Sequence, residues 1–212
     1  MTLAKICGLS TPEAVKAALD GGAAYLGFVF FDKSPRCVTP ELAARLAEPA
    51  RGRAKIVAVV VDPDDEAVDR IAGILRPNLF QLHGKETPQR ATGIIARAET
   101  AVIKAFPISE PSDLDAARPF EDVALHQMFD AKTPEGSANP GGMGAKFDWT
   151  MLKGRRMSRP WFLAGGLDPW NVAEAVSQSG APMVDVSSGV ERGPGLKDPA
   201  LISAFLDAVR RA

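Results

Sequence analysis

Cysteine is scarce in this sequence of 212 residues. It occurs only twice, as Cys7 and Cys37, which is too few for a four-thiolate zinc site or a framework of several disulfides. Long apolar runs are also missing, because Gly, Pro and charged residues interrupt every run well before the roughly 18 residues that a membrane-spanning helix needs. We therefore expect a protein that does not enter a membrane and that works in a reducing compartment.

The sequence has no excess of either charge. It contains 25 Lys plus Arg against 26 Asp plus Glu, which gives a formal net charge of -1. Without a basic field the chain is not expected to bind nucleic acid or an anionic membrane surface, so any anion site must be local. Residues 1–8 lack the basic start and apolar stretch of a secretion signal, and we expect a cytoplasmic location. Motifs for a nucleotide P-loop, a zinc site or a catalytic serine are also missing.

Short apolar runs do alternate with helical patterns from one end of the chain to the other. This alternation is typical of repeated βα units around a parallel sheet. Eight runs are expected to be strands: 3–7, 25–30, 56–61, 79–82, 102–106, 124–129, 161–164 and 183–186. An open doubly wound sheet alternates in the same way, but eight units favour closure into a single (β/α)8 TIM barrel over residues 1–212.

Helix starts are marked by a capping residue placed before a proline. The pattern occurs five times, at 10–13, 39–41, 62–65, 87–88 and 168–169. A shorter fifth helix is expected at 111–117, a weak sixth at 147–152 and a last one at 198–211. The longest expected loop, 131–145, follows the sixth strand and is rich in Gly, Pro, Ser and Asn.

The active site of such a barrel forms at the carboxyl ends of its strands. Two glycine-containing segments at this edge, Gly165-Gly166 and Ser188-Gly189, follow the seventh and eighth strands. Glycine lets backbone N–H groups approach phosphate oxygens, and barrels often bind phosphate at this place, so a phosphate site is indicated. The alternative is that each segment only makes a tight turn.

Side chains that can move protons or bind anions lie at the same edge. Cys7 ends the first strand, where it is either a small buried apolar residue or a base whose thiolate Lys5 favours. Asp130 is either a loop cap or a partly buried general acid. Arg36 suits a carboxylate or a phosphate, although a solvated arginine is common. His83 and Asp185 are further candidates, and Cys37 is expected to be structural; no sequence feature pairs it with Cys7.

Read together, these fragments make the chain resemble the phosphoribosylanthranilate isomerase family over nearly its full length. The matching motifs, in order, are Lys5-Ile6-Cys7-Gly8, Gly27-Phe28-Val29-Phe30 with Ser34-Pro35-Arg36, Gln81-Leu82-His83-Gly84, Phe129-Asp130, Phe147-Asp148-Trp149, Ala164-Gly165-Gly166-Leu167 with Asn171-Val172, and the run 184–191. The resemblance implies a TIM barrel that isomerises N-(5'-phosphoribosyl)anthranilate in tryptophan biosynthesis, with neither a metal nor an organic cofactor. We expect a monomer or a homodimer, between which no sequence feature decides.

The resemblance also implies a role for each candidate residue. Asp130 would protonate the ring oxygen of the sugar, and Cys7 would remove the C2 proton as a thiolate. Arg36 would hold the carboxylate of the anthranilate, and Asp185 would orient the substrate. The glycine segments, with Gly165, Gly166, Ser188 and Gly189, would hold the phosphate.

One departure from the family pattern lies in the loop after the sixth strand, where Met143 stands at a position that usually carries a small hydroxyl residue. This weakens the assignment of that loop as a phosphate ligand. Other functions remain open. The related aminoaldose isomerase of histidine biosynthesis and a bifunctional barrel both handle phosphate similarly, but the former carries an aspartate where this chain has Cys7. A non-catalytic sensor of phosphorylated metabolites would not need Cys7 and Asp130 together.

Overall fold

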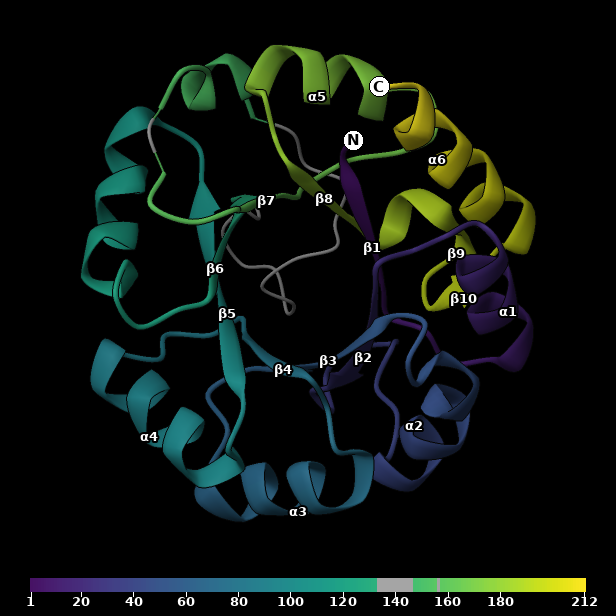
Figure 1. Cartoon of the computed structure of the whole chain (residues 1–212), viewed down its shortest axis with the longest axis vertical. Coiled ribbons are helices and arrows are strands. Elements are labelled where there is room, and N and C mark those ends of the chain that lie inside the picture. Colours follow the sequence, from purple (N-terminus) through teal and green to yellow (C-terminus); the bar gives the residue numbers. More distant parts are fainter. Residues whose placement is uncertain (133–146, 156) are drawn as a thin grey trace.

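The computed structural model describes residues 1–132, 147–155 and 157–212. Eight parallel strands form a closed barrel in chain order, and β1 pairs with β8 to complete the ring (Figure 1). The strands are β1 (Leu3–Cys7), β2 (Tyr25–Phe30), β3 (Lys55–Val60), β4 (Leu79–Leu82), β5 (Ala101–Ile108), β6 (His126–Ala131), β7 (Phe162–Leu163) and β8 (Met183–Val186). The prediction of a closed barrel rather than an open sheet is confirmed.

Helical segments surround the barrel. The α-helices are α1 (Pro12–Asp20), α2 (Pro40–Ala47), α3 (Asp65–Leu75), α4 (Pro88–Ala98), α5 (Val172–Ser179) and α6 (Pro199–Arg211), and the 3-10 segments are η1 (Glu48–Ala50), η2 (Pro111–Phe120), η3 (Trp149–Leu152) and η4 (Ser188–Val190). Three of the five expected caps before a proline form, whereas at 62–65 the cap is Asp64 and α3 begins at Asp65, beyond Pro63. The hydroxyls of Thr11, Thr39 and Thr87 each accept a hydrogen bond from the backbone N–H three residues later, and proline occupies the first helical position after each.

Three local predictions are corrected. The fifth and sixth helical stretches are the 3-10 segments η2 and η3 rather than α-helices. The helix after β7 begins at Val172 and not near Pro169, because the Asp168 carboxylate accepts hydrogen bonds from the backbone N–H groups of Trp170 and Asn171 and holds a turn there. Strand β6 extends to Ala131, so Asp130 lies within it rather than after it.

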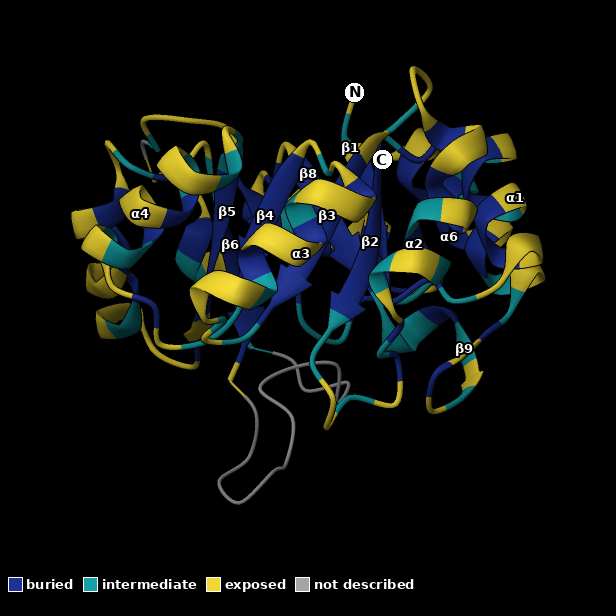
Figure 2. Ribbon diagram, turned by 90° about the horizontal axis from the view of Figure 1, so that it is seen from below, coloured by how far each residue is buried: buried dark blue, intermediate teal, exposed yellow. Residues whose placement is uncertain are grey.

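Two apolar layers hold these elements in place. Successive side chains along each strand point alternately outward and inward. The outward set packs against the helices, and the inward set, which includes Cys7, Met128 and Phe162, fills the barrel. Figure 2 shows buried strands behind helices whose outer faces are exposed. Among the described helices none is long and apolar enough to cross a membrane.

A short antiparallel hairpin follows β8 and was not predicted. Its strands are β9 (Glu191–Gly193) and β10 (Leu196–Lys197). It lies at the carboxyl-terminal end of the barrel, at the rim opposite the N-terminus of the chain (Figure 2).

Candidate active site

Cys7 lies at the carboxyl end of β1 and faces the interior of the barrel. Two residues earlier on the same face, Lys5 is fully buried, and its Nζ donates a hydrogen bond to Asp185 Oδ1 on the neighbouring strand β8 at 2.8 Å. A Cβ added at Gly27 on β2 would lie 3.0 Å from both Cys7 Sγ and Lys5 Nζ. The glycine therefore provides the space in which the thiol and the ammonium group meet.

The charges around Cys7 act on its ionisation in opposite directions. Burial raises the pKa of the Cys7 thiol above its ordinary value, and Asp185 raises it further, whereas Lys5 and, more weakly, Lys197 lower it. Burial by itself would lower the pKa of Lys5, but the negative charge of Asp185 and the contact with Cys7 raise it, so Lys5 stays a cation. The thiol is therefore mostly protonated at rest, with a permanent positive charge beside it to stabilise a thiolate.

Asp130 faces the same interior, since it lies two residues after Met128 on β6. Its carboxylate is buried, and Oδ2 lies 3.3 Å from Nε2 of His83, at the end of β4. The other ring nitrogen of His83, Nδ1, lies 2.9 Å from Nε2 of Gln81. When the Gln81 amide donates to Nδ1, His83 carries its proton on Nε2 and presents it to Asp130. Asp130 is thus held by one hydrogen-bonding side chain from a neighbouring part of the rim.

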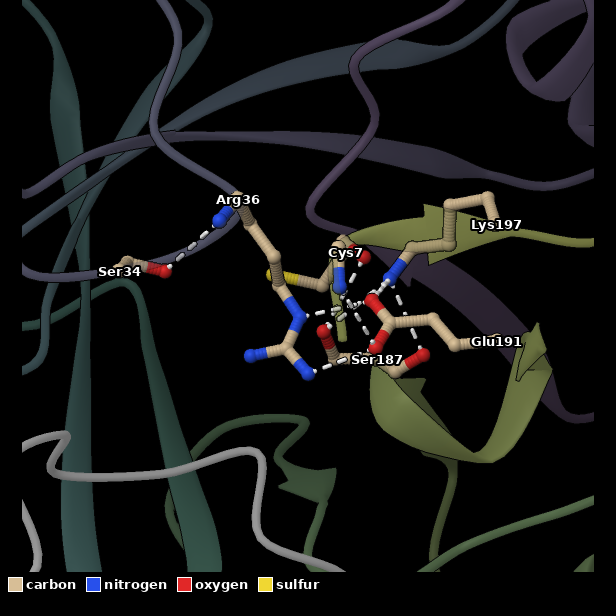
Figure 3. Close-up of polar contacts among 7 residues, drawn as sticks. Cys7, Ser34, Arg36, Ser187, Glu191 and Lys197 are labelled. Carbon is tan, nitrogen blue, oxygen red and sulfur yellow. Dashed lines mark hydrogen bonds and ion pairs between the residues drawn. The ribbon is translucent and has the colours of Figure 1, made fainter. Parts of the chain in front are cut away.

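Arg36 lies in the loop after β2, where its backbone N–H donates to Ser34 Oγ at 3.2 Å. Its side chain is buried and forms a two-point contact with Glu191: Nε to Oε1 at 2.7 Å and Nη2 to Oε2 at 2.8 Å. Lys197 also binds Oε1 of Glu191 and donates to the backbone oxygen of Ser187. Figure 3 shows Cys7, Arg36, Glu191 and Lys197 gathered at one place.

The two glycine segments lie against each other. A Cβ added at Gly189 would come within 1.9 Å of the backbone oxygen of Leu167, so the segment after β8 rests directly on the segment after β7. Gly165 has a φ of +89°, and a Cβ there would lie 2.3 Å from the backbone nitrogen of Ala131. Asn171 donates from Nδ2 to the backbone oxygen of Gly166 at 2.8 Å. Only glycine fits both contacts, and the two loops are closely packed against their neighbours at the rim.

The structure brings most of the predicted residues to one end of the barrel. Cys7 and Asp185 meet through Lys5, Asp130 pairs with His83, and the segments containing Gly165, Gly166, Ser188 and Gly189 adjoin. Met143 lies outside the described residues, as does most of the long loop that contains it. Both cysteines are free. Cys37 lies on the second loop, with Sγ 3.7 Å from Asp32 Oδ1.

Two residues of the site, Glu191 and Lys197, had no predicted role. Glu191 is the last residue of the 184–191 motif, and Lys197 lies in no motif. Only the folded hairpin reveals that Glu191 contacts both Arg36 and Lys197. Among residues 1–132, 147–155 and 157–212, no group of three or more His, Cys, Asp or Glu is arranged to hold a metal ion. The chemistry available at this rim is that of a thiol, a carboxyl group, an imidazole and cationic anion-binding groups.

Known proteins match this chain along its whole length. The family model described as N-(5'phosphoribosyl)anthranilate (PRA) isomerase matches residues 4–208. An N-(5'-phosphoribosyl)anthranilate isomerase of Caulobacter vibrioides is 69% identical, over 99% of this chain and 96% of its own length. Dimeric phosphoribosylanthranilate isomerase from Thermotoga maritima, solved as monomers generated from the dimer, superposes with a TM-score of 0.84 at 33% identity, covering 100% of both chains. A phosphoribosylanthranilate isomerase in complex with reduced 1-(o-carboxyphenylamino)-1-deoxyribulose 5-phosphate superposes with a TM-score of 0.86 at 32% identity, again over 100% of both chains. On the agreement of fold and sequence, the chain belongs to the N-(5'-phosphoribosyl)anthranilate isomerase family.

Proposed function

We propose that this chain catalyses its family's reaction with Cys7 as the general base and Asp130 as the general acid. The family is one of isomerases of tryptophan biosynthesis, which convert N-(5'-phosphoribosyl)anthranilate into 1-(2-carboxyphenylamino)-1-deoxyribulose 5-phosphate by an Amadori rearrangement. The observation that carries the assignment of roles is the placement of a thiol beside a buried cation and of a buried carboxyl group on the same interior face of the barrel.

The acid step opens the sugar ring. In its protonated form Asp130 gives its proton to the ring oxygen while the bond from that oxygen to C1 breaks and the aniline nitrogen lone pair forms a C=N bond. The product of this step is a cationic Schiff base. The carboxylate that remains on Asp130 accepts a hydrogen bond from Nε2 of His83, 3.3 Å from Oδ2, and it takes a proton back from solvent before the next turnover.

The base step removes the proton from C2, which the cationic Schiff base makes acidic. Cys7 takes this proton as a thiolate, and the electrons of the C–H bond form a C1=C2 double bond and neutralise the nitrogen. The resulting enolamine then tautomerises to the ketone. Lys5 stabilises the thiolate during this step because its ammonium group is fixed beside the sulfur by Asp185.

The remaining site residues bind the two ends of the substrate. Arg36 holds the anthranilate carboxylate, Asp185 orients the sugar, and the segments with Gly165, Gly166, Ser188 and Gly189 hold the phosphate through backbone N–H groups. Holding the substrate at both ends places C2 at Cys7 and the ring oxygen at Asp130, and it removes the entropic cost of aligning them during the reaction.

The direct test is turnover of freshly generated N-(5'-phosphoribosyl)anthranilate by the purified chain without added metal, followed by the loss of substrate fluorescence. We expect conversion to the deoxyribulose phosphate product. In the same assay the aminoaldose substrate of histidine biosynthesis should not turn over, because that reaction's family carries an aspartate in place of Cys7. Turnover of the second substrate alone would contradict the proposal.

The domain organisation, the oligomeric state and the location of the enzyme are also proposed. We propose that residues 1–212 act as one catalytic domain, since a single barrel spans them. The small-molecule substrate is bound by a monomer or a homodimer, and a relative from Thermotoga maritima is described as dimeric. A cytoplasmic location suits the two free cysteines, because a reducing compartment keeps the Cys7 thiol reduced and therefore able to act as a base.

Replacing Lys5 with methionine is expected to shift the pH dependence of the reaction. Lys5 lowers the pKa of Cys7, so its loss raises that pKa further, and the base becomes available only at higher pH. The rising limb of kcat/KM should move upward by about one pH unit, which corresponds to a roughly tenfold loss near neutrality. The rate constant for alkylation of Cys7 by iodoacetamide, measured as a function of pH, checks the same shift of the thiol pKa. Lys16→Met, which removes an exposed lysine from α1, is the control; an unmoved limb in Lys5→Met would contradict the role of Lys5.

Replacing Gly189 with alanine is expected to weaken phosphate binding. The new methyl group would meet the Leu167 carbonyl at 1.9 Å and must force the two glycine segments apart. Losing one or two charge-assisted hydrogen bonds should raise KM by about tenfold or more with little change in kcat, and inorganic phosphate should inhibit correspondingly less. Gly93→Ala on α4, where a Cβ meets nothing within 4 Å, is the matched control. An unchanged KM would remove these segments from the phosphate site.

A further inference from the structure

The β9–β10 hairpin places two charged residues directly opposite each other. Glu191 on β9 pairs in register with Lys197 on β10, so both side chains project to the same side of the hairpin. The turn between the strands includes Gly195, which has a φ of +78° and approaches the second loop so closely that a Cβ would lie 2.5 Å from the backbone oxygen of Pro35. The hairpin is therefore seated on the loop that carries Arg36.

Glu191 is bound from three directions. Arg36 contacts both carboxylate oxygens and Lys197 contacts Oε1 (Figure 3). The backbone nitrogen of Gly195 lies 3.3 Å from Oε2 and donates to it. The three charged side chains are nearly inaccessible to solvent, with exposed fractions of 9% for Arg36, 4% for Glu191 and 0% for Lys197. Two parallel hydrogen bonds to one edge of a planar guanidinium fix its orientation as well as its position.

The charge of this group is unbalanced toward the positive. Arg36 and Lys197 contribute two positive charges against one from Glu191, so the three together carry one net positive charge. Burial raises the pKa of Glu191, but the hydrogen bond from Arg36 and the charge of Lys197 outweigh this and lower it, so the carboxylate stays ionised. Without Lys197, the arginine and the carboxylate would cancel, and the site would offer an incoming anion no net attraction.

We propose that Glu191 is a positioning residue for the substrate's carboxylate: it fixes the guanidinium plane of Arg36, and Lys197 restores the positive charge that Glu191 removes. The inference rests on the proposed function, in which Arg36 binds the anthranilate carboxylate. It assigns to the hairpin the selection of substrates that carry this group, whereas the glycine segments select the phosphate and Cys7 and Asp130 carry out the chemistry.

The test compares two ligands that differ only in this carboxylate. One is reduced 1-(o-carboxyphenylamino)-1-deoxyribulose 5-phosphate, the compound bound in a solved relative, and the other is its phenylamino counterpart without the carboxyl group. The ratio of their Kd values, measured by calorimetry, reports the preference for the carboxylate. The wild type is expected to prefer the carboxylated ligand by about tenfold or more, as a charge-assisted two-point contact gives.

Three variants separate orientation from charge. Glu191→Gln combined with Lys197→Met keeps the net charge of the group at plus one but removes the two-point contact. Glu191→Asp also keeps the charge and withdraws the carboxylate by one methylene, which provides a milder change should the double variant fold poorly. Arg192→Gln removes a positive charge from an exposed position of the same hairpin and serves as the control.

The double variant should lose most of the carboxylate preference, Glu191→Asp should lose part of it, and Arg192→Gln should keep it. The Kd of the ligand without the carboxyl group should change by less than about twofold in all three, which a general loss of structure would not allow. A preference retained in both Glu191 variants overturns the inference. Wild-type turnover is measured in parallel, so a wild type that binds but does not isomerise would instead overturn the proposed function.

Discussion

Replacing Cys7 with serine is expected to lower kcat by about two to four orders of magnitude while leaving KM within a few-fold of the wild-type value. General-base catalysis contributes about this much, and a serine hydroxyl is a far weaker base than a thiolate at neutral pH. KM should change little because Cys7 acts on C2, whereas the proposed binding contacts are at the carboxylate and the phosphate. Steady-state fluorescence of the substrate measures both constants.

The second cysteine provides the matched control for this experiment. Cys37→Ser makes the same atomic change on the loop after β2, where the thiol is half-buried and contacts Asp32. This variant should keep wild-type kcat. Cys7→Ser should also bind the reduced product analogue as the wild type does, which separates a lost base from a disturbed barrel. Wild-type turnover by Cys7→Ser would remove Cys7 from the mechanism.

The pH dependence gives Cys7 a second test. Because burial raises the thiol pKa and the base must be deprotonated, kcat/KM should increase with pH until the thiol is ionised. In Cys7→Ser this rising limb should vanish along with most of the rate. A limb that persists unchanged in the variant would belong to another group.

The barrel could be predicted from the sequence because strand and helix signals are local. The strand over residues 79–82 was predicted with its observed bounds, and so was the strand over 183–186. Capping threonines before prolines mark α1, α2 and α4 because the cap and the first turn are made by neighbouring residues. The predicted start of α5 was wrong because Asp168 and Pro169 suit a turn as well as a helix start. The hydrogen bonds that the Asp168 carboxylate accepts from the backbone N–H groups of Trp170 and Asn171 stabilise the turn.

Candidate site residues could be predicted where a reactive side chain lies at the end of a predicted strand. Contacts between side chains that are distant in the sequence could not. Cys7 and Asp130 stand at strand ends that the barrel fold itself identifies. The contact of Lys5 with Asp185 joins residues 180 positions apart, and that of Arg36 with Glu191 joins residues 155 apart. Neither contact has a local signature. Whether two such side chains meet depends on barrel closure and on a seven-residue hairpin, which only tertiary structure reveals.

Replacing Asp130 with asparagine is expected to lower kcat by about two to four orders of magnitude, again with little effect on binding. Asparagine has nearly the same shape and can still accept a hydrogen bond from His83, but its amide cannot deliver a proton to the ring oxygen. Asp122→Asn, at an exposed position before β6, is the matched control and should have wild-type kcat. A fully active Asp130→Asn variant would mean that a group other than Asp130 is the general acid.

Combining the two variants tests whether the acid and the base act in successive steps. A catalytic group changes rates and not the equilibrium of ring opening, so the slower of two impaired steps sets kcat. Cys7→Ser with Asp130→Asn should therefore be about as slow as the worse single variant, and its loss should fall well short of the product of the two single losses. A fully multiplicative loss would mean that both groups stabilise one transition state, with proton transfer at the ring oxygen and at C2 concerted rather than separated by a Schiff base.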